Sequence, residues 1–295
     1  MKSLEGKTVT IAGLGLMGGA MAMGFKKLGP QKVCAYDVNE EVLETALTKG
    51  AIDWGVSSEE DLKAVLGESD LVMICLYPRL AAEFVLTYMD AFKEGALLTD
   101  ITGVKQFLMK QLDGQLRDDL DFIYGHPMAG SEKEGFGGAD DSIFKGRNYI
   151  LIPRPENRPE NLLWIKRIMT ELGFVNIVET TPEGHDQKIA FTSQLCHVIA
   201  SALVDSEDDL HITDYEGGSF GDLTRIAMIN AKMWTELFLT NKEALLAQID
   251  KFEQSMADLR AFIDEEDSES LIDRLNSVRH KRIIMEIDRQ NKDIL

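Results

Sequence analysis

The sequence contains few cysteines and no run of basic residues, and both absences exclude classes of protein. The 295-residue chain has three cysteines, Cys34, Cys75 and Cys196, which are widely spaced and set in apolar sequence. A disulfide framework or a metal site is therefore not expected, and buried free thiols in the reducing cytoplasm fit better. With 31 Lys and Arg against 50 Asp and Glu, the net charge of −19 disfavours binding to nucleic acid or to anionic membranes.

The chain also lacks a long uninterrupted hydrophobic run. Residues 8–25 carry no charge and follow two lysines, so they superficially resemble a signal peptide or a short membrane span. Five glycines interrupt this stretch, Lys26 and Lys27 end it, and no small-residue cleavage motif is present. Residues 8–25 are therefore expected to form part of a folded cytoplasmic domain that has no membrane partner.

The first part of the chain alternates short apolar runs with helical stretches. The runs that read as strands are TVTIAG, KVCAYD, LVMICLY, ALLTDI, DFIYG, NYILIP and FVNIVET. Short apolar runs that are bounded by turns and separated by amphipathic helices indicate a parallel sheet covered on both faces. The fold class is thus predicted to be α/β, with a doubly wound Rossmann-like domain over residues 1–180.

From about Thr181 onward no convincing strand appears, and an all-helical domain is predicted over residues 181–295. One apolar seam on a predicted helix has steps of 4, 3, 4 and 3 residues and consists of Leu245, Ile249, Phe252, Met256 and Leu259. This periodicity alone leaves open whether the seam packs within the chain or against a second copy. A final helix is expected from about Leu271 to Ile287.

A glycine-rich turn follows the first strand and matches GxGxxG. Its residues are Gly13, Leu14, Gly15, Leu16, Met17 and Gly18. The first glycine permits the tight turn, the second permits a close approach to a pyrophosphate, and the third permits close packing of helix and strand. Asp37 ends the second strand, 24 residues after Gly13, where it could bind the ribose hydroxyls and repel a 2′-phosphate. These residues predict a site for NAD rather than NADP, against the alternative of a tight turn that binds nothing.

His126 follows the strand-like run DFIY. Ligands of doubly wound sheets bind outside the carboxyl ends of the strands, so a histidine at this position is expected to face the cofactor crevice. It could accept a proton from a substrate hydroxyl while a hydride leaves the same carbon. The alternative is a loop histidine that caps backbone groups.

The candidates in the helical part are ambiguous when their residues are considered alone. His197 on an apolar face could be a core histidine, and Arg225 could pair with Asp222 across a helical turn. The functional alternative is that both residues bind an anionic substrate, since a guanidinium binds a carboxylate bidentately. His185 lies in polar sequence and is given no role.

Six segments together resemble the prephenate dehydrogenase family, which includes arogenate dehydrogenases. They are GLGLMGGA, YDVN, GHPMAGSEKEG, HDQKIAFTSQLCH, GGSFGDLTRIA and MWTELFLTNKEALL, and they extend over essentially the whole chain. HPMAG and TRIA in this order are specific, whereas more distant hydroxyacid dehydrogenases share only the GLGxMG opening. The resemblance implies NAD-dependent oxidative decarboxylation of prephenate to 4-hydroxyphenylpyruvate in tyrosine biosynthesis.

The resemblance also implies roles for individual residues. His126 is expected to act as the general base on the ring hydroxyl and Arg225 as the clamp for a substrate carboxylate. Ser193, His197 and Trp234 are expected to line the substrate pocket. The resemblance further implies a homodimer that forms through the helical domain.

The sequence departs from the family pattern in three segments, one of which places Gly221 where a basic residue is frequent before Asp222. Gly103 stands where the family commonly has serine, and Thr102 is the candidate to supply the missing hydroxyl. Gln194 and Cys196 replace histidine and proline, which is expected to change one polar contact in the pocket. These departures leave open whether prephenate or arogenate is preferred.

Two other functions stay open from the sequence. One is a dehydrogenase of another small hydroxyacid, and the other is an NAD-binding sensor without turnover. In every case an anionic ligand must overcome the charge of −19 through local positive groups. The expected groups are the helix N-terminus after Gly13, Arg225 and Lys105.

Overall fold

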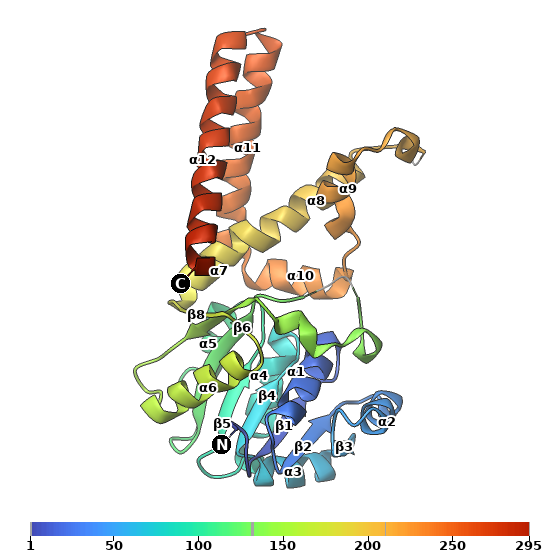
Figure 1. The fold of residues 1–295 in the computed structure, drawn as a ribbon, viewed down its shortest axis with the longest axis vertical. Coiled ribbons are helices and arrows are strands. Elements are labelled where there is room, and N and C mark those ends of the chain that lie inside the picture. The colour runs from blue at the N-terminus through green and yellow to red at the C-terminus, as the bar shows by residue number, and fades with distance from the viewer. Residues whose placement is uncertain (1, 131–132, 210, 295) are drawn as a thin grey trace. The chain divides into compact units, whose positions relative to one another are not determined.

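The computed structural model describes residues 2–130, 133–209 and 211–294 (Figure 1). Its contacts divide the chain into two compact units, residues 1–244 and residues 245–295. The first unit holds the sheet together with the helices that follow it as far as residue 244. The second unit is a helical hairpin.

Eight strands form a single sheet in the order β3-β2-β1-β4-β5-β6-β7-β8. Their bounds are β1 Thr8–Ala12, β2 Lys32–Tyr36, β3 Trp54–Val56, β4 Leu71–Ile74, β5 Leu97–Asp100, β6 Asp121–Pro127, β7 Asn148–Ile152 and β8 Asn176–Glu179. The expectation of a wholly parallel sheet is wrong at one edge, because β7 pairs antiparallel with β6 and β8 pairs parallel with β7. The described residues between β6 and β7 form no α-helix but only two 3₁₀ turns, η2 (Phe136–Gly138) and η3 (Asp141–Phe144), whereas parallel neighbours are usually joined by a crossover helix.

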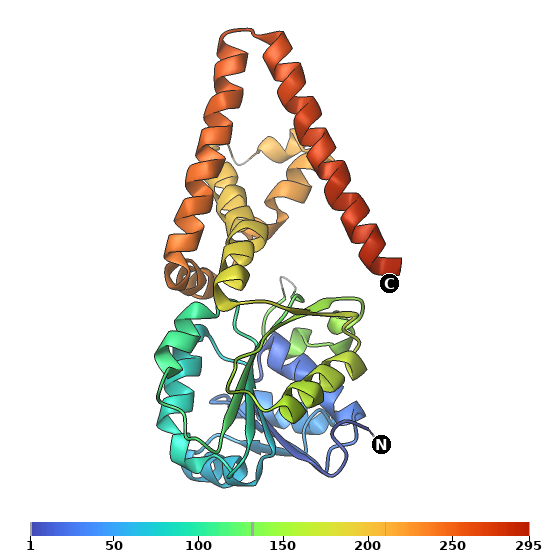
Figure 2. The ribbon, with the colours of Figure 1, turned by 90° about the vertical axis from the view of Figure 1, so that its left-hand side faces the viewer.

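Helices cover both faces of the sheet, as Figure 2 shows with the sheet seen nearly edge-on. One face carries α1 (Leu16–Lys27), α2 (Glu40–Thr48) and α6 (Pro159–Glu171), whose apolar side chains share one core cluster. The other face carries α3 (Glu59–Glu68), α4 (Pro78–Thr87) and α5 (Gln106–Leu112), which share the second cluster. The predicted doubly wound architecture is confirmed.

After β8 all regular structure in the described part of the chain is helical. The elements are α7 Pro182–Ile189, the π turn η4 Ala190–Gln194, α8 Leu195–Asp205, η5 Ile212–Tyr215, α9 Gly218–Thr224, η6 Arg225–Ala227, α10 Ala231–Thr240, α11 Lys242–Asp264 and α12 Ser268–Ile294. Helix α12 is longer at both ends than the expected stretch from Leu271 to Ile287. No helix among the described residues is long and apolar enough to cross a membrane.

The two compact units divide at residue 244, beyond the expected domain boundary at residues 180 and 181. Helices α7 to α10 group with the sheet in part because α7 bonds to the start of α5 through Asp186. The boundary at residue 180 stays a prediction.

Helices α11 and α12 run antiparallel and form the second unit, orange and red in Figure 1. Arg274 of α12 bonds Asp258 of α11 at 2.9 Å, and its guanidinium lies 5.8 Å from the ring centre of Phe262. Met256 of the predicted seam is 52% exposed in the single chain. Helix α12 likewise exposes a set of large apolar side chains, namely Ile272, Leu275, Val278, Ile283, Ile284, Met285 and Ile287.

The three cysteines are free thiols, as expected, but they are not all buried. Cys34 is buried in β2, and burial raises the pKa of its thiol. Cys196 is exposed on α8, so the expectation of a buried thiol is wrong there. The reason is that the Cys196 side of α8 has no covering element within the single chain.

Candidate active site

The glycine-rich turn has the geometry that a dinucleotide site needs. Gly13 has φ +92°, and a Cβ at this position would lie 2.7 Å from the carbonyl oxygen of Cys75. A Cβ on Gly18 would lie 1.9 Å from the Gly13 carbonyl oxygen, whereas a Cβ on Gly15 would meet nothing within 4 Å. Gly15 also precedes the first turn of α1, so the open backbone and the helix N-terminus face the same space.

Asp37 lies beside this turn at the carboxyl end of β2. Its carboxylate accepts hydrogen bonds from the Leu14 N–H at 2.8 Å and from the Asn39 N–H at 2.9 Å. A carboxylate has further lone pairs, so Asp37 can still accept hydrogen bonds from ribose hydroxyls. A cleft of about 220 Å³ adjoins it and is lined mainly by apolar groups, including Leu76, Leu80 and Phe84. These residues fit the adenosine half of a dinucleotide.

The remaining residues of the turn have different surroundings. Leu14 is buried, so only its backbone could approach a ligand, whereas Leu16 and Met17 are partly buried in the first turn of α1. Gly19 and Gly138 bring the loop that follows His126 onto α1, because their Cβ positions abut Phe136 and Leu16 respectively. Two segments about 120 residues apart thus meet at the same edge of the sheet.

His126 belongs to a strand and not, as expected, to the loop that follows it. Strand β6 runs to Pro127, and His126 is paired with Ile150 of β7. The preceding residue must be glycine, because a Cβ on Gly125 would lie 1.8 Å from the hydroxyl oxygen of buried Tyr149. The strand therefore holds the backbone of His126 at the carboxyl end of the sheet.

A chain of hydrogen bonds connects His126 to α7. His126 Nδ1 lies 2.9 Å from His185 Nε2, and His185 Nδ1 lies 2.7 Å from Asp186 Oδ1. The Asp186 carboxylate also accepts the backbone N–H groups of Lys105, at 2.8 Å, and of Gln106, at 2.9 Å. We refer to His126, His185 and Asp186 as the relay.

The relay defines the tautomer of both histidines. Because the Asp186 carboxylate can only accept, the proton on His185 lies on Nδ1. His185 Nε2 must then accept a hydrogen bond from the N–H of His126 Nδ1, which leaves a lone pair on His126 Nε2. A base whose tautomer is set in this way is the arrangement that general base catalysis requires.

Both histidines are held neutral near pH 7. Burial, the neighbouring His185 and the Lys105 ammonium together lower the pKa of His126 well below its ordinary value. Burial also lowers the pKa of His185, although Asp186 opposes the shift. His126 is therefore available as a base at pH values where an ordinary histidine is already protonated.

Sequence reasoning missed His185 and Asp186, although both are buried at the centre of the site. The polar residues around them in the sequence read as a solvated helix start. The sequence feature that could have indicated them is the adjacent His-Asp pair in the first turns of the helix that follows the last strand.

Lys105 and Thr102 do not occupy the expected positions. The Lys105 side chain is fully buried, and its ammonium bonds Asp100 Oδ2 at 2.6 Å, so it cannot bind a substrate or cofactor anion as expected. The Thr102 hydroxyl is also buried, within hydrogen-bonding distance of the Asp100 carboxylate and the Val104 carbonyl. Thr102 is directed into the protein and does not replace the family serine.

Three of the predicted pocket residues do come together. His197 Nδ1 bonds the Ser193 carbonyl oxygen at 2.9 Å, and its ring stacks on Trp234 with centres 3.6 Å apart. This bond leaves His197 Nε2 for other partners, and burial lowers the His197 pKa. Ser193 lies in the π turn between α7 and α8, a kind of distortion that is frequent at functional sites.

Arg225 begins the 3₁₀ turn η6, which packs against α8. Its side chain is exposed in the single chain. The structure thus places Arg225 on the segment that contacts the helix of His197.

Sequence models of two domain families match the chain. The nucleotide-binding domain of prephenate dehydrogenase matches residues 21–178, and the dimerization domain of the same enzyme matches residues 181–277. The chain belongs to the prephenate dehydrogenase family. It is accordingly an oxidoreductase with a nucleotide-binding domain.

Similar proteins extend over nearly the full length of the chain. A crystal structure of Aquifex aeolicus prephenate dehydrogenase in complex with hydroxyphenyl propionate and NAD+ is 34% identical, with a TM-score of 0.87, over 96% of this chain and 100% of that one. Prephenate dehydrogenase of Bacillus subtilis is 29% identical over 90% of this chain and 72% of its own length. Cyclohexadienyl dehydrogenase of Zymomonas mobilis is 29% identical over 96% of this chain and 97% of its own length.

Two of the three departures from the family pattern have structural explanations. Gln194 is buried, and its amide donates to the Leu237 carbonyl at 3.0 Å and accepts from Asn241 at 2.8 Å. Through these bonds Gln194 of η4 is connected to α10 and to Asn241, which follows α10, and the expected change of a pocket contact stays a prediction. A Cβ on Gly103 would lie 3.3 Å from the Leu237 side chain, so this position also faces α10.

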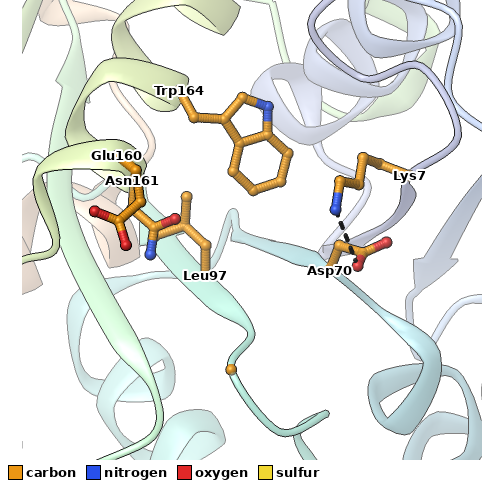
Figure 3. Close-up of a pocket in the computed structure, with 7 residues that line it drawn as sticks. Lys7, Asp70, Leu97, Glu160, Asn161 and Trp164 are labelled. Carbon is orange, nitrogen blue, oxygen red and sulfur yellow. Dashed lines mark hydrogen bonds and ion pairs between the residues drawn. The ribbon is translucent and has the colours of Figure 1, made fainter.

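A separate cleft of about 330 Å³ lies at the opposite, amino-terminal edge of the sheet (Figure 3). Lys7 and Asp70 form an ion pair on one side of it, and Trp164 of α6 lines another side. Asp70 also binds Lys93 and the backbone of Thr8, so its charge is already compensated. This cleft is remote from both Gly13 and His126.

No group of three or more His, Cys, Asp or Glu that could hold a metal ion exists among the residues that the structure describes.

Proposed function

We propose that this chain is an NAD-dependent prephenate dehydrogenase, which converts prephenate to 4-hydroxyphenylpyruvate with loss of carbon dioxide in the biosynthesis of tyrosine. The observation that carries the proposal is the relay, which directs a neutral His126 with a free Nε2 to the carboxyl edge of a sheet that also bears a dinucleotide turn. Membership of the family supplies the substrate class.

The cofactor would be held by the turn from Gly13 to Gly18 and by Asp37. The backbone of Gly15 and the N-terminus of α1 suit the pyrophosphate, and Asp37 suits the ribose hydroxyls. A carboxylate at this position disfavours the 2′-phosphate of NADP. When bound, NAD supplies the acceptor for the hydride.

His126 Nε2 would accept the proton of the ring hydroxyl while the hydride leaves the same carbon. As the bond between the ring and its carboxylate breaks, its electron pair restores the aromatic ring, and His126 returns the proton to the phenolic oxygen. The products are 4-hydroxyphenylpyruvate, carbon dioxide and the reduced cofactor, with no net release of a proton from dianionic prephenate. His185 and Asp186 would keep His126 in the productive tautomer throughout.

The substrate would lie between His126 and the segment of α8. We assign Arg225 as the clamp for a carboxylate, since its planar fork matches two carboxylate oxygens. Ser193, His197 and Trp234 would form the pocket wall, where they already lie in contact. Thr102 is left out of this assignment because its hydroxyl is directed inward.

We also propose a cytoplasmic homodimer that forms through the helical domain of residues 181–295. The exposed apolar side chains of α12 and Met256 of α11 form a surface of the kind that protein partners cover. The matching dimerization-domain model supports a second copy of the chain as that partner.

A paired assay with two substrates and two cofactors tests the proposal. Mixing the protein with NAD and prephenate should generate reduced nicotinamide, and NADP should be used poorly. Activity with arogenate alone would make the chain an arogenate dehydrogenase. Activity only with another small hydroxyacid, or NAD binding without turnover, would refute the proposal in favour of a different dehydrogenase or a sensor.

Replacing the base should remove turnover but not cofactor binding. His126→Asn is expected to lower kcat by at least about a hundredfold, the scale of losing a general base. The dissociation constant of NAD should stay nearly unchanged because Asp37 and the glycine turn are untouched. A rate near that of the wild type would refute the role of His126.

A further inference from the structure

The backbone of Gly125, the residue before His126, is bound by side chains at a point where its neighbouring strand has ended. The last paired residues of β5 and β6 are Thr99 and Ile123, so Gly125 has no strand partner on that side. Its N–H donates to Asp100 Oδ1 at 3.2 Å, and its carbonyl accepts from Lys105 Nζ. Asp100 and Lys105 therefore take the place of the missing strand.

The Lys105 ammonium has one acceptor for each of its three protons. These acceptors are Asp100 Oδ2 at 2.6 Å, Thr102 Oγ1 at 3.3 Å and the carbonyl of Gly125. The side chain is fully buried, and these three acceptors match the three donors of an ammonium. An ammonium with this set of partners is fixed in orientation.

The backbone of Lys105 contributes to the other end of the relay. Its N–H donates to Asp186 Oδ1 at 2.8 Å, the same oxygen that binds His185 Nδ1. One residue therefore contacts the backbone just before His126 and also the carboxylate that orients the imidazole through His185.

We propose that Lys105 is a positioning residue for His126, which it holds through the Gly125 carbonyl on one side and through Asp186 on the other. The proposal rests on the proposed function, in which His126 is the base. A buried ion pair is by itself weak evidence of a stabilising role, since apolar residues of similar volume often serve as well. In Lys105, instead, both the ammonium, through the Gly125 carbonyl, and the backbone N–H, through Asp186, help to place the imidazole of His126.

The test removes the ammonium while keeping the length of the side chain. Lys105→Met leaves Asp100 buried without its partner, so the double variant Asp100→Asn/Lys105→Met is made beside it, because asparagine still offers an acceptor to the Gly125 N–H. Lys110→Met is the matched control, since Lys110 lies exposed on the same helix. Folding of each variant is checked by circular dichroism and thermal melting.

The expected kinetic result is a loss confined to the chemical step. In the folded variants kcat with NAD and prephenate should fall about 10- to 100-fold, the scale of a misplaced catalytic group. The KM for NAD should stay within about twofold, because the hydrogen-bond partners of Lys105 are Asp100, Thr102, Gly125 and Asp186 and not residues of the cofactor turn. Lys110→Met should behave as wild type.

A second measurement needs no turnover. In ¹⁵N-histidine-labelled wild-type protein, two-bond ¹H–¹⁵N correlations should show His126 protonated on Nδ1. The variants keep the backbone N–H that binds Asp186 but lose the bond to the Gly125 carbonyl, so His126 is no longer held against His185 Nε2 and should show a mixture of tautomers. His197, which is bonded to Ser193 and has no contact with Lys105, is the internal reference.

Three results would overturn the proposal. The first is that His126 of the wild type is protonated on Nε2. The second is that a folded variant has a kcat within about twofold of wild type. The third is that a variant loses activity because the KM for both ligands rises, while the tautomer of His126 is unchanged. If wild type itself did not oxidise prephenate, the proposed function would fail, but the spectra would still decide whether Lys105 positions His126.

Discussion

Replacing Asp186 by asparagine changes one hydrogen-bond acceptor of the relay into a donor, while the shape of the side chain is nearly conserved. An amide offers one acceptor oxygen and one donor nitrogen in place of two acceptor oxygens. In one orientation the nitrogen faces the Gln106 N–H, and in the other it faces the Lys105 N–H and His185 Nδ1. Each orientation leaves one backbone N–H of the α5 start opposite another donor.

The second orientation changes the tautomers. The amide nitrogen would donate to His185 Nδ1, so the His185 proton would move to Nε2 and would be donated to His126 Nδ1. His126 would then carry its proton on Nε2, the atom that must accept a proton from the substrate. The preference for the productive tautomer would be lost.

The size of the effect follows from the hydrogen bond that is weakened. A bond between a carboxylate and a histidine N–H contributes about 1.5–3 kcal/mol, which corresponds to a factor of about 10–150. We therefore expect Asp186→Asn to lower kcat about 10- to 150-fold. The KM for NAD should be unchanged, because Asp37 and the glycine turn do not contact α7.

The assay is the initial rate of NAD reduction with saturating prephenate, and Asp113→Asn is the control. Asp113 is an exposed carboxylate at the end of α5, so this variant loses the same charge without touching the relay. A kcat for Asp186→Asn within about threefold of wild type, in a folded protein, would refute the role of the relay.

Three further predictions concern the cofactor, packing and pH. Asp37→Ala should raise the KM for NAD and relax discrimination against NADP, and an unchanged cofactor preference would place ribose recognition elsewhere. Gly125→Ala should destabilise the fold by about 3 kcal/mol or more in urea unfolding, because its Cβ would collide with buried Tyr149, whereas Gly137→Ala, with nothing within 4 Å, should be nearly neutral. The pKa values of His126 and His185 are lowered in the folded state. As the pH falls below about 6.5, the unfolded chain therefore binds protons that the folded chain does not. The free energy of unfolding should then fall by up to about 1.4 kcal/mol per histidine per pH unit. A flat free energy of unfolding between pH 7 and pH 5 would contradict the neutral state of both histidines.

The sequence predicts most of the fold, because apolar runs and helical periodicity are local signals. It does not predict the direction of β7, since an apolar run such as NYILIP is compatible with either a parallel or an antiparallel neighbour. It also misses β3, whose three residues are too few for a periodic pattern and include exposed Trp54.

The site is predicted less completely, because its decisive contacts join residues that are distant in the chain. The glycine turn, Asp37 and His126 are readable because each lies at the carboxyl end of a strand-like run. The bond between His126 and His185 joins positions 59 residues apart, and no local pattern indicates it. Lys105 reads as a cation for an anionic ligand, and only the structure reveals that it is buried and paired with Asp100.

The role of His126 in oxidising prephenate is tested most sharply by measuring carbon dioxide and reduced nicotinamide simultaneously with prephenate and NAD. If His126 acts on the ring hydroxyl of prephenate, the two products form in equal amounts in the wild type, and both rates fall together in His126→Asn. Reduction of NAD without release of carbon dioxide would contradict oxidative decarboxylation. Product formation that does not depend on His126 would contradict its role as the base.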